Sequence, residues 1–241
     1  MYQPKDKLEL RELIADEYIY LGNIDTSYIF DMSYLFLEFD EQSNDLNDLN
    51  NDICIISRKD FSGIETWNTS NVEDMSYMFY ECTNFNKNIS SWNTSRVINM
   101  RGMFFSCYEF NQPLNTWNVS NVKNMHCMFE NCYNFDQNLS SWNTSNVEDM
   151  SGMFYNCRNF NQDLSSWNIS NVKDKDCIFK NTLKEQIFKM KQMTVESSAY
   201  RVEYSTPNKK AYYQKKQTFC ASEEAWNKFA NFVENLKKRI K

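Results

Sequence analysis

The amino-acid sequence predicts an α/β repeat fold, a short solenoid in which coils of 25 residues stack on one another. The first observation is that tryptophan recurs at this interval from Trp67 to Trp167, and that other apolar residues recur with it. The second is that one such unit cannot bury its apolar side chains alone, whereas stacked units cover one another's faces. We therefore expect one continuous core, with short parallel strands and short helical or 3-10 turns in each coil.

The recurring positions define the expected core. They are Trp67, Trp92, Trp117, Trp142 and Trp167; Val72, Val97, Val122, Val147 and Val172; Met75, Met100, Met125 and Met150; Phe79, Phe104, Phe129, Phe154 and Phe179; Cys82, Cys107, Cys132 and Cys157; and Phe85, Phe110, Phe135 and Phe160. Within one coil, Leu139–Asn143 is short and fits an extended strand. The apolar residues from Val147 to Cys157 follow helical or 3-10 spacing, so we expect a strand, a turn, one or two helical turns and a return loop.

Changes in the pattern at both ends set the expected domain organisation. Residues 1–22 form an N-terminal helical cap, because Asp6–Ala15 has the pattern of a short amphipathic helix. Residues 23–182 form the solenoid, with a divergent first coil at 23–59, which carries an acidic loop insertion at Glu41–Asp52, and regular coils at 60–182. Residues 183–241 lack the repeat and predict a small α+β appendage, with a hairpin around Pro207–Asn208 and an amphipathic helix after Ser222.

Charge is divided along the chain and limits the expected partners. The net charge is −6, with 26 acidic and 13 basic residues up to Thr182 but 6 acidic and 13 basic residues from Leu183 onward. An acidic body repels phosphate backbones, so we expect no duplex nucleic acid as a partner. The sequence shows no signal peptide and no run of 18 apolar residues, which predicts a cytoplasmic protein without a transmembrane segment.

The unit W-N-T-S-N-V-x-x-M-x-x-M-F-x-x-C-x-x-F-N resembles that of the BspA-like leucine-rich-repeat surface proteins of bacteria. The resemblance covers residues from about Ile24 to Asn181, and it does not extend to the last 59 residues. It implies a right-handed leucine-rich-repeat-like solenoid and a role in recognising host or neighbouring-cell components. It also implies a surface or secreted location, which is the alternative to the cytoplasm.

The residues capable of chemistry favour a protein without catalytic function, cofactor or metal. Four of the eight cysteines occupy one repeat position, where packed thiols are the favoured interpretation and disulfides between coils the alternative. His126, Cys127 and Cys132 are the nearest approach to a metal cluster, but a zinc site needs about four convergent ligands. His126 is the only histidine, and no hydrolase, P-loop or zinc-protease motif occurs.

Positions that vary between coils are expected to face solvent and to carry recognition. Two such columns are rich in aromatic residues and arginine, the types that dominate interface hot spots. The candidate interaction surface consists of Tyr80, Phe105, Tyr108, Tyr133, Tyr155 and Arg158. A simpler interpretation is that these rings cover the edge of the core. The sequence thus favours a noncatalytic binding module, with a structural or weakly self-associating protein and an enzyme carried by the C-terminal region as alternatives.

Overall fold

The computed structural model describes residues 1–37 and 58–182. The chain divides into two compact units, Met1–Ala199 and Tyr200–Lys241, and all described residues belong to the first. The acidic insertion at Glu41–Asp52 and the hairpin and helix predicted within 183–241 lie outside the described residues.

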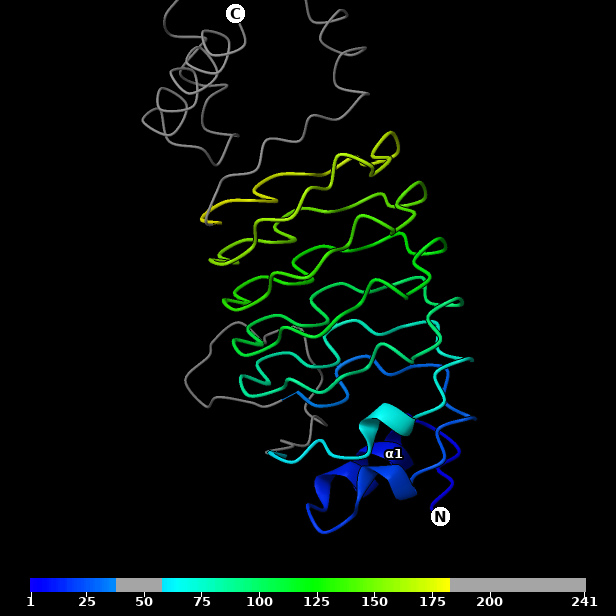
Figure 1. Cartoon of the computed structure of the whole chain (residues 1–241). Coiled ribbons are helices and arrows are strands. Elements are labelled where there is room, and N and C mark those ends of the chain that lie inside the picture. Colours follow the sequence, from blue (N-terminus) through cyan, green and yellow to red (C-terminus); the bar gives the residue numbers. More distant parts are fainter. Residues whose placement is uncertain (38–57, 183–241) are drawn as a thin grey trace, which may run out of the picture. The chain divides into compact units, whose positions relative to one another are not determined.

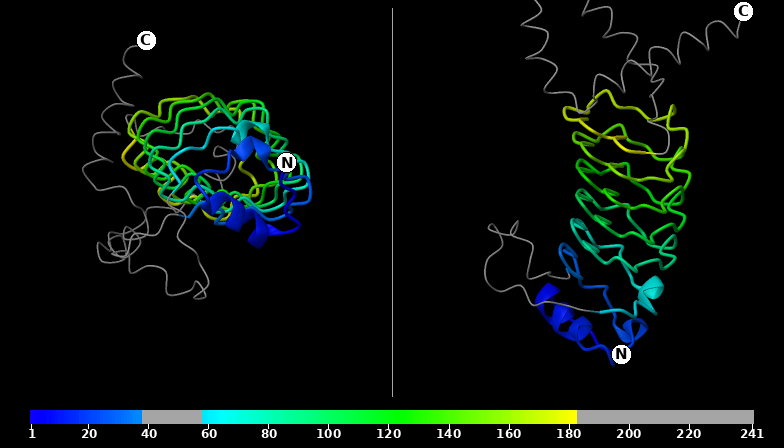
Figure 2. Two further views of the ribbon diagram at one scale, coloured as in Figure 1. Left: turned by 90° about the horizontal axis from the view of Figure 1, so that it is seen from below. Right: turned by 90° about the vertical axis from the view of Figure 1, so that its left-hand side faces the viewer.

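The repeats form a stack of coils, one coil for each 25 residues (Figure 1). Seen along the stack, successive coils overlie one another (Figure 2). Parallel β-bridges join neighbouring coils at one recurring position: Asp31 to Asp74, Asp74 to Asn99, Asn99 to Asn124, Asn124 to Asp149, and Asp149 to Asp174. The segment from Ile24 to Phe36 therefore enters the stack as its first coil. The assignment of this stack to the right-handed leucine-rich-repeat class stays a prediction.

The described residues contain one α-helix, α1 (Lys7–Ala15), and two 3-10 helices, η1 (Leu21–Asn23) and η2 (Ile64–Thr66). The β-structure in this part of the chain consists of single bridges rather than strands. Leu139–Asn143, for which the pattern favoured a strand, forms a turn in which Trp142 N donates to Leu139 O at 3.1 Å. The main ladder between coils lies instead in the segment with helical spacing.

This ladder uses every second backbone N–H of the segment from Met150 to Asn156. Met150 N, Gly152 N, Phe154 N and Asn156 N donate to carbonyl oxygens of the next coil at 2.8–2.9 Å. Between them, Met153 N donates to Met150 O at 3.1 Å and Cys157 N donates to Phe154 O at 3.0 Å, which closes two successive turns. A turn of this kind places its first and fourth residues on the same side, so its apolar spacing imitates that of a helix.

Two positions in each coil from Tyr77 onward, and one in the described part of the first coil, have a positive φ angle, which lets these turns close. They are Tyr34, Tyr77, Gly102, Cys127, Gly152 and Cys177 at the first position, and Glu81, Ser106, Asn131, Asn156 and Asn181 at the second. Only two of these eleven residues are glycines, although the left-handed region costs other residues roughly 1–2 kcal/mol. The bonds between coils compensate for this strain at each level of the stack.

Aromatic side chains run through the core as continuous ladders. The rings of Trp92 and Trp117 stack with centroids 6.5 Å apart, and those of Phe104 and Phe129 with centroids 5.5 Å apart. The indole N–H of each recurring tryptophan also donates a hydrogen bond to a backbone carbonyl oxygen. Trp142 Nε1, for example, donates to Leu114 O in the preceding coil at 2.9 Å. The recurring tryptophans are thus buried without leaving a polar atom unsatisfied.

The repeated cysteines are buried thiols that donate hydrogen bonds to backbone carbonyls. Cys107 Sγ donates to Phe79 O at 3.0 Å, Cys132 Sγ to Phe104 O at 2.9 Å, and Cys157 Sγ to Phe129 O at 2.8 Å. Cys82 makes the corresponding bond to Phe36 O. Burial raises the pKa of Cys107, Cys132 and Cys157 well above the usual value. Packing rather than bridging between coils is therefore the role of this column.

Helix α1 covers the N-terminal end of the stack. Its N-cap is Asp6, whose side chain accepts a hydrogen bond from Glu9 N, and it buries Leu10 and Ile14 against the core. Arg58 fastens this cap to the regular coils, because the residue is 2% exposed and its guanidinium donates to the carbonyl oxygens of Ile14, Asp16 and Ile19. Burial lowers the pKa of Arg58, an effect that the Asp60 carboxylate opposes.

The central ring of the phenylalanine ladder offers a test of the core. We expect Phe129→Ala to lower the free energy of unfolding by about 3–5 kcal/mol, because Phe129 is fully buried among Phe104, Phe135 and Phe154. Phe105→Ala removes the same ring from a half-buried position in the neighbouring coil and should cost clearly less. Denaturant unfolding measures both, and equal losses would contradict this assignment of inside and outside.

The bonds from Arg58 to the N-terminal cap, which we call the arginine clamp, give a second prediction. Arg58→Met keeps the length of the side chain but removes the guanidinium that donates to four backbone carbonyl oxygens, so it should cost about 2–4 kcal/mol. The matched control is Arg96→Met, because Arg96 lies on the surface and pairs with Glu73 at 3.3 Å. Surface ion pairs of this kind contribute about 0–1 kcal/mol to the free energy of unfolding. Thermal unfolding of the two variants should separate them, and similar melting temperatures would rule out the clamp.

The thiol column gives a third prediction. In the native protein, Cys82, Cys107, Cys132 and Cys157 should resist alkylation, whereas all four should react in denaturant. Mass spectrometry of digested protein after timed labelling assigns the reaction to each cysteine. Native labelling at the rate of the unfolded chain would show that these thiols are not part of the core.

Candidate functional site

Several of the positions at which the coils differ lie along one face of the stack. We call this the variable face and define it by the positions of Ser151, Tyr155 and Arg158 and their equivalents in the other coils. The buried residues between these positions, such as Met153 and Phe154, recur with little change. A constant interior therefore supports an exterior whose chemistry changes from coil to coil.

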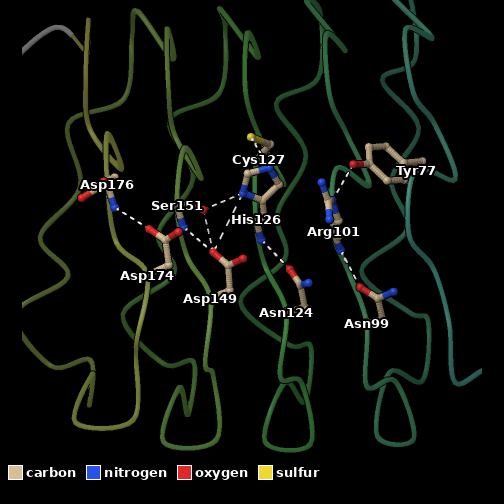
Figure 3. Close-up of polar contacts among 10 residues, drawn as sticks. All are labelled: Tyr77, Asn99, Arg101, Asn124, His126, Cys127, Asp149, Ser151, Asp174 and Asp176. Carbon is tan, nitrogen blue, oxygen red and sulfur yellow. Dashed lines mark hydrogen bonds and ion pairs between the residues drawn. The ribbon is translucent and has the colours of Figure 1, made fainter. Parts of the chain in front are cut away.

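An Asp or Asn side chain positions the first row of the variable face in each coil (Figure 3). The Oδ1 atom of Asn124 accepts a hydrogen bond from His126 N at 2.9 Å, and Asp149 Oδ1 accepts one from Ser151 N at the same distance. Corresponding bonds hold the other coils. The row that they hold consists of Ser33, Ser76, Arg101, His126, Ser151 and Asp176. The repeated bond fixes the backbone whichever side chain follows, although Ser33, Ser76 and Ser151 of this row are themselves buried.

The predicted aromatic residues lie on this face and pair along the stack. Tyr80 stacks on Phe105 with ring centroids 4.8 Å apart, and Tyr108 stacks on Tyr133 at 4.7 Å. Arg158 Cζ lies 4.3 Å from the centroid of the Tyr133 ring and covers its other face. The structure thus brings five of the six predicted residues into two clusters.

Tyr155 does not join these clusters. Its ring is covered by Lys180, whose Nζ lies 5.4 Å from the ring centroid, and Glu130 occupies the equivalent position in the coil between Phe105 and Tyr155. Among the predicted residues only Tyr108, with 38% of its surface accessible, and Arg158 count as exposed. The other rings are half-buried.

The first aromatic cluster continues toward the N-terminus through residues that the sequence interpretation missed. Tyr77 packs edge-on against Tyr80 at 5.8 Å and stacks on Tyr34 at 4.9 Å. Arg101 Nε donates to the Tyr77 hydroxyl at 2.6 Å. Alignment of the first coil on the second would have revealed this pair, since Tyr34 and Tyr77 follow Met32 and Met75 at the same offset.

A smaller apolar patch lies on another column of the stack. Tyr28, Phe30 and Ile98 are 57%, 54% and 42% exposed. Glu73 N donates to Phe30 O and Ile98 N donates to Glu73 O, both at 2.8 Å, so Glu73 separates the two apolar side chains. This patch provides an internal comparison for the variable face.

The only histidine belongs to a polar cluster on the variable face (Figure 3). His126 Nδ1 lies 2.6 Å from Ser151 Oγ, and His126 Nε2 lies 3.3 Å from Cys127 Sγ. Cys132, which the sequence interpretation grouped with these two residues, is instead buried in the core and donates to Phe104 O. No group of three or more His, Cys, Asp or Glu side chains within residues 1–37 and 58–182 has an arrangement suited to a metal ion.

In the part of the chain that the structure describes, no helix has the length and apolar character needed to cross a bilayer. Comparisons with curated proteins and with solved structures give no match.

A protein-family model matches this chain in two overlapping stretches, residues 54–143 and 121–232. Together they span more than half of the sequence and include the regular coils that carry the variable face. The double match agrees with the tandem repeat in the sequence. The chain therefore belongs to the DUF285 family, which is described as Mycoplasma protein of unknown function.

Proposed function

We propose that this protein is a noncatalytic repeat protein whose variable face binds another protein. The observation that carries the proposal is the pair of aromatic clusters at coil spacing, one ending in Arg158 and the other bordered by Arg101. Tyrosine and arginine are the residue types most enriched at interface hot spots. Rings that stack on one another are also rigid, so they lose little conformational entropy when a partner covers them.

The chemistry of the partner follows from which parts of the rings remain accessible. One face of each ring is occupied by a neighbouring ring, and Arg158 covers the second face of Tyr133, which disfavours a ligand that must itself stack between aromatic faces. Edges, hydroxyl groups and guanidinium donors remain, and these suit a protein surface with apolar and acidic groups. The resemblance to BspA-like leucine-rich-repeat surface proteins supports a partner from a host or neighbouring cell, and with it a surface location.

Self-assembly through end-to-end stacking is the second candidate. Helix α1 covers the N-terminal end of the stack, and Leu10 and Ile14 bury the apolar surface that a second copy would need there. This argues against indefinite stacking. Light scattering over a range of concentrations distinguishes the two functions, because a ladder of oligomers would favour assembly over partner binding.

The binding proposal predicts which variants lose the partner. We expect the double variant Tyr108→Ala, Tyr133→Ala to weaken binding by roughly 30-fold or more, as for loss of an interface hot spot of about 2 kcal/mol. The partner is first isolated by capture from host or neighbouring-cell surface extract and then titrated against purified protein. The matched control is Tyr28→Ala, Phe30→Ala, which removes two rings that are more exposed than Tyr108 and Tyr133 from the other patch. Loss of binding in the control alone would place the interface elsewhere.

A further inference from the structure

Cys127 differs from the repeated cysteines of the core. It occupies the first left-handed position of its coil, with a φ angle of 52°, and its side chain is partly exposed. The residue above it in the next coil is Gly152, where an added Cβ would lie only 2.8 Å from Cys127 Sγ. Glycine at this position therefore provides the space that the sulfur occupies outside the core.

A directed chain of hydrogen bonds favours one tautomer of the neighbouring imidazole. Ser151 Oγ donates to Asp149 Oδ1 at 2.7 Å, so its oxygen is left to accept a bond from His126 Nδ1 at 2.6 Å. The proton of the neutral imidazole then lies on Nδ1, and the lone pair of Nε2 points at Cys127 Sγ, 3.3 Å away. The thiol thus faces a base that can take its proton.

The thiol needs this base. Burial raises the pKa of Cys127 far above the usual value. The Glu130 carboxyl raises it further, through a hydrogen bond with the thiol and through its charge, while Arg101 opposes the shift. Cys127 is therefore a neutral thiol at pH 7 and a poor nucleophile unless its proton leaves with the reaction. The thiols of Cys107, Cys132 and Cys157 instead donate to backbone carbonyl oxygens, which are too weakly basic to take the thiol proton.

The surrounding backbone favours one class of electrophile. Attack on a carbonyl compound requires N–H donors for the developing oxyanion. Cys127 N already donates to Ser151 O at 2.8 Å, and His126 N donates to Asn124 Oδ1 at 2.9 Å. A hydroperoxide needs no oxyanion hole, since its leaving oxygen is neutralised by one proton.

We propose that Cys127 is a modification site at which His126 activates the thiol for oxidation by a small hydroperoxide to sulfenic acid. His126 Nε2 takes the thiol proton as the sulfur attacks the terminal oxygen of ROOH. The O–O bond breaks, and the departing alkoxide takes a proton from His126. The sulfur loses two electrons and the peroxide gains them, so the products are Cys–SOH and ROH. The assignment does not depend on the proposed binding function.

The test treats the folded full-length protein with hydrogen peroxide in the presence of a dimedone probe, which traps sulfenic acid. Mass spectrometry then quantifies the labelling rate of each cysteine. We expect Cys127 to be labelled at least about 10-fold faster than Cys107, Cys132 and Cys157, which serve as controls within the same molecule. Equal rates for Cys127 and these core thiols would overturn the proposal.

Two variants with opposite expected effects separate activation from simple exposure. His126→Gln keeps a polar side chain but removes the base, and it should slow labelling of Cys127 by about 10-fold or more. Glu130→Gln removes a carboxylate that disfavours the thiolate, and it should accelerate labelling. Both side chains lie at the surface of the stack, and matched melting temperatures verify the fold. An unchanged rate in His126→Gln, or slower labelling in Glu130→Gln, would show that Cys127 reacts without the proposed activation.

Discussion

The structure depends on the register of the hydrogen bonds between coils. Every second N–H of the segment from Met150 to Asn156 donates to the next coil, and the same alternation recurs through the stack. Because a residue can bond only to the coil above or below it, a shift by one residue would direct core side chains outward. The 25-residue period of the core follows from this register, since each coil must return its chain to the same bonding position.

The turns within each coil explain how so short a chain closes a full circuit. Two residues in each coil from Tyr77 onward adopt the left-handed region, and most of them are not glycines. Their strain is tolerated because alternate backbone N–H groups donate to carbonyl oxygens of the next coil, while N–H groups between them close the turns within the coil. Side chains extend the same principle, as the indole of Trp142 and the thiol of Cys157 both donate to carbonyl oxygens of a preceding coil. Among the described residues, no buried side-chain nitrogen or oxygen lacks a partner.

This constant interior makes the variable face possible. An Asp or Asn two residues earlier holds the backbone of the Arg101, His126 and Ser151 row, so these side chains can differ without disturbing the stack. The result is an ordered series of positions, each carrying different chemistry. Stacked tyrosines lie at some levels, and a histidine with its adjacent thiol lies at another. Recognition and reactivity can therefore occupy neighbouring coils of a single surface.

The sequence by itself determined the period, the identity of the core positions and the columns that vary, because burial imposes the same residue types at each level. It also assigned Tyr80, Phe105 and Tyr155 to one variable column and Tyr108, Tyr133 and Arg158 to another.

The local conformation was decided only by the tertiary structure. Apolar spacing does not distinguish a helix from two successive turns, and the inter-coil bonds of Met150 and Gly152 select the turns. The association of His126 with Cys127 and Ser151 rather than Cys132 likewise depends on which side chains point outward. That direction follows from the left-handed backbone at Cys127, a conformation that the residue type does not predict.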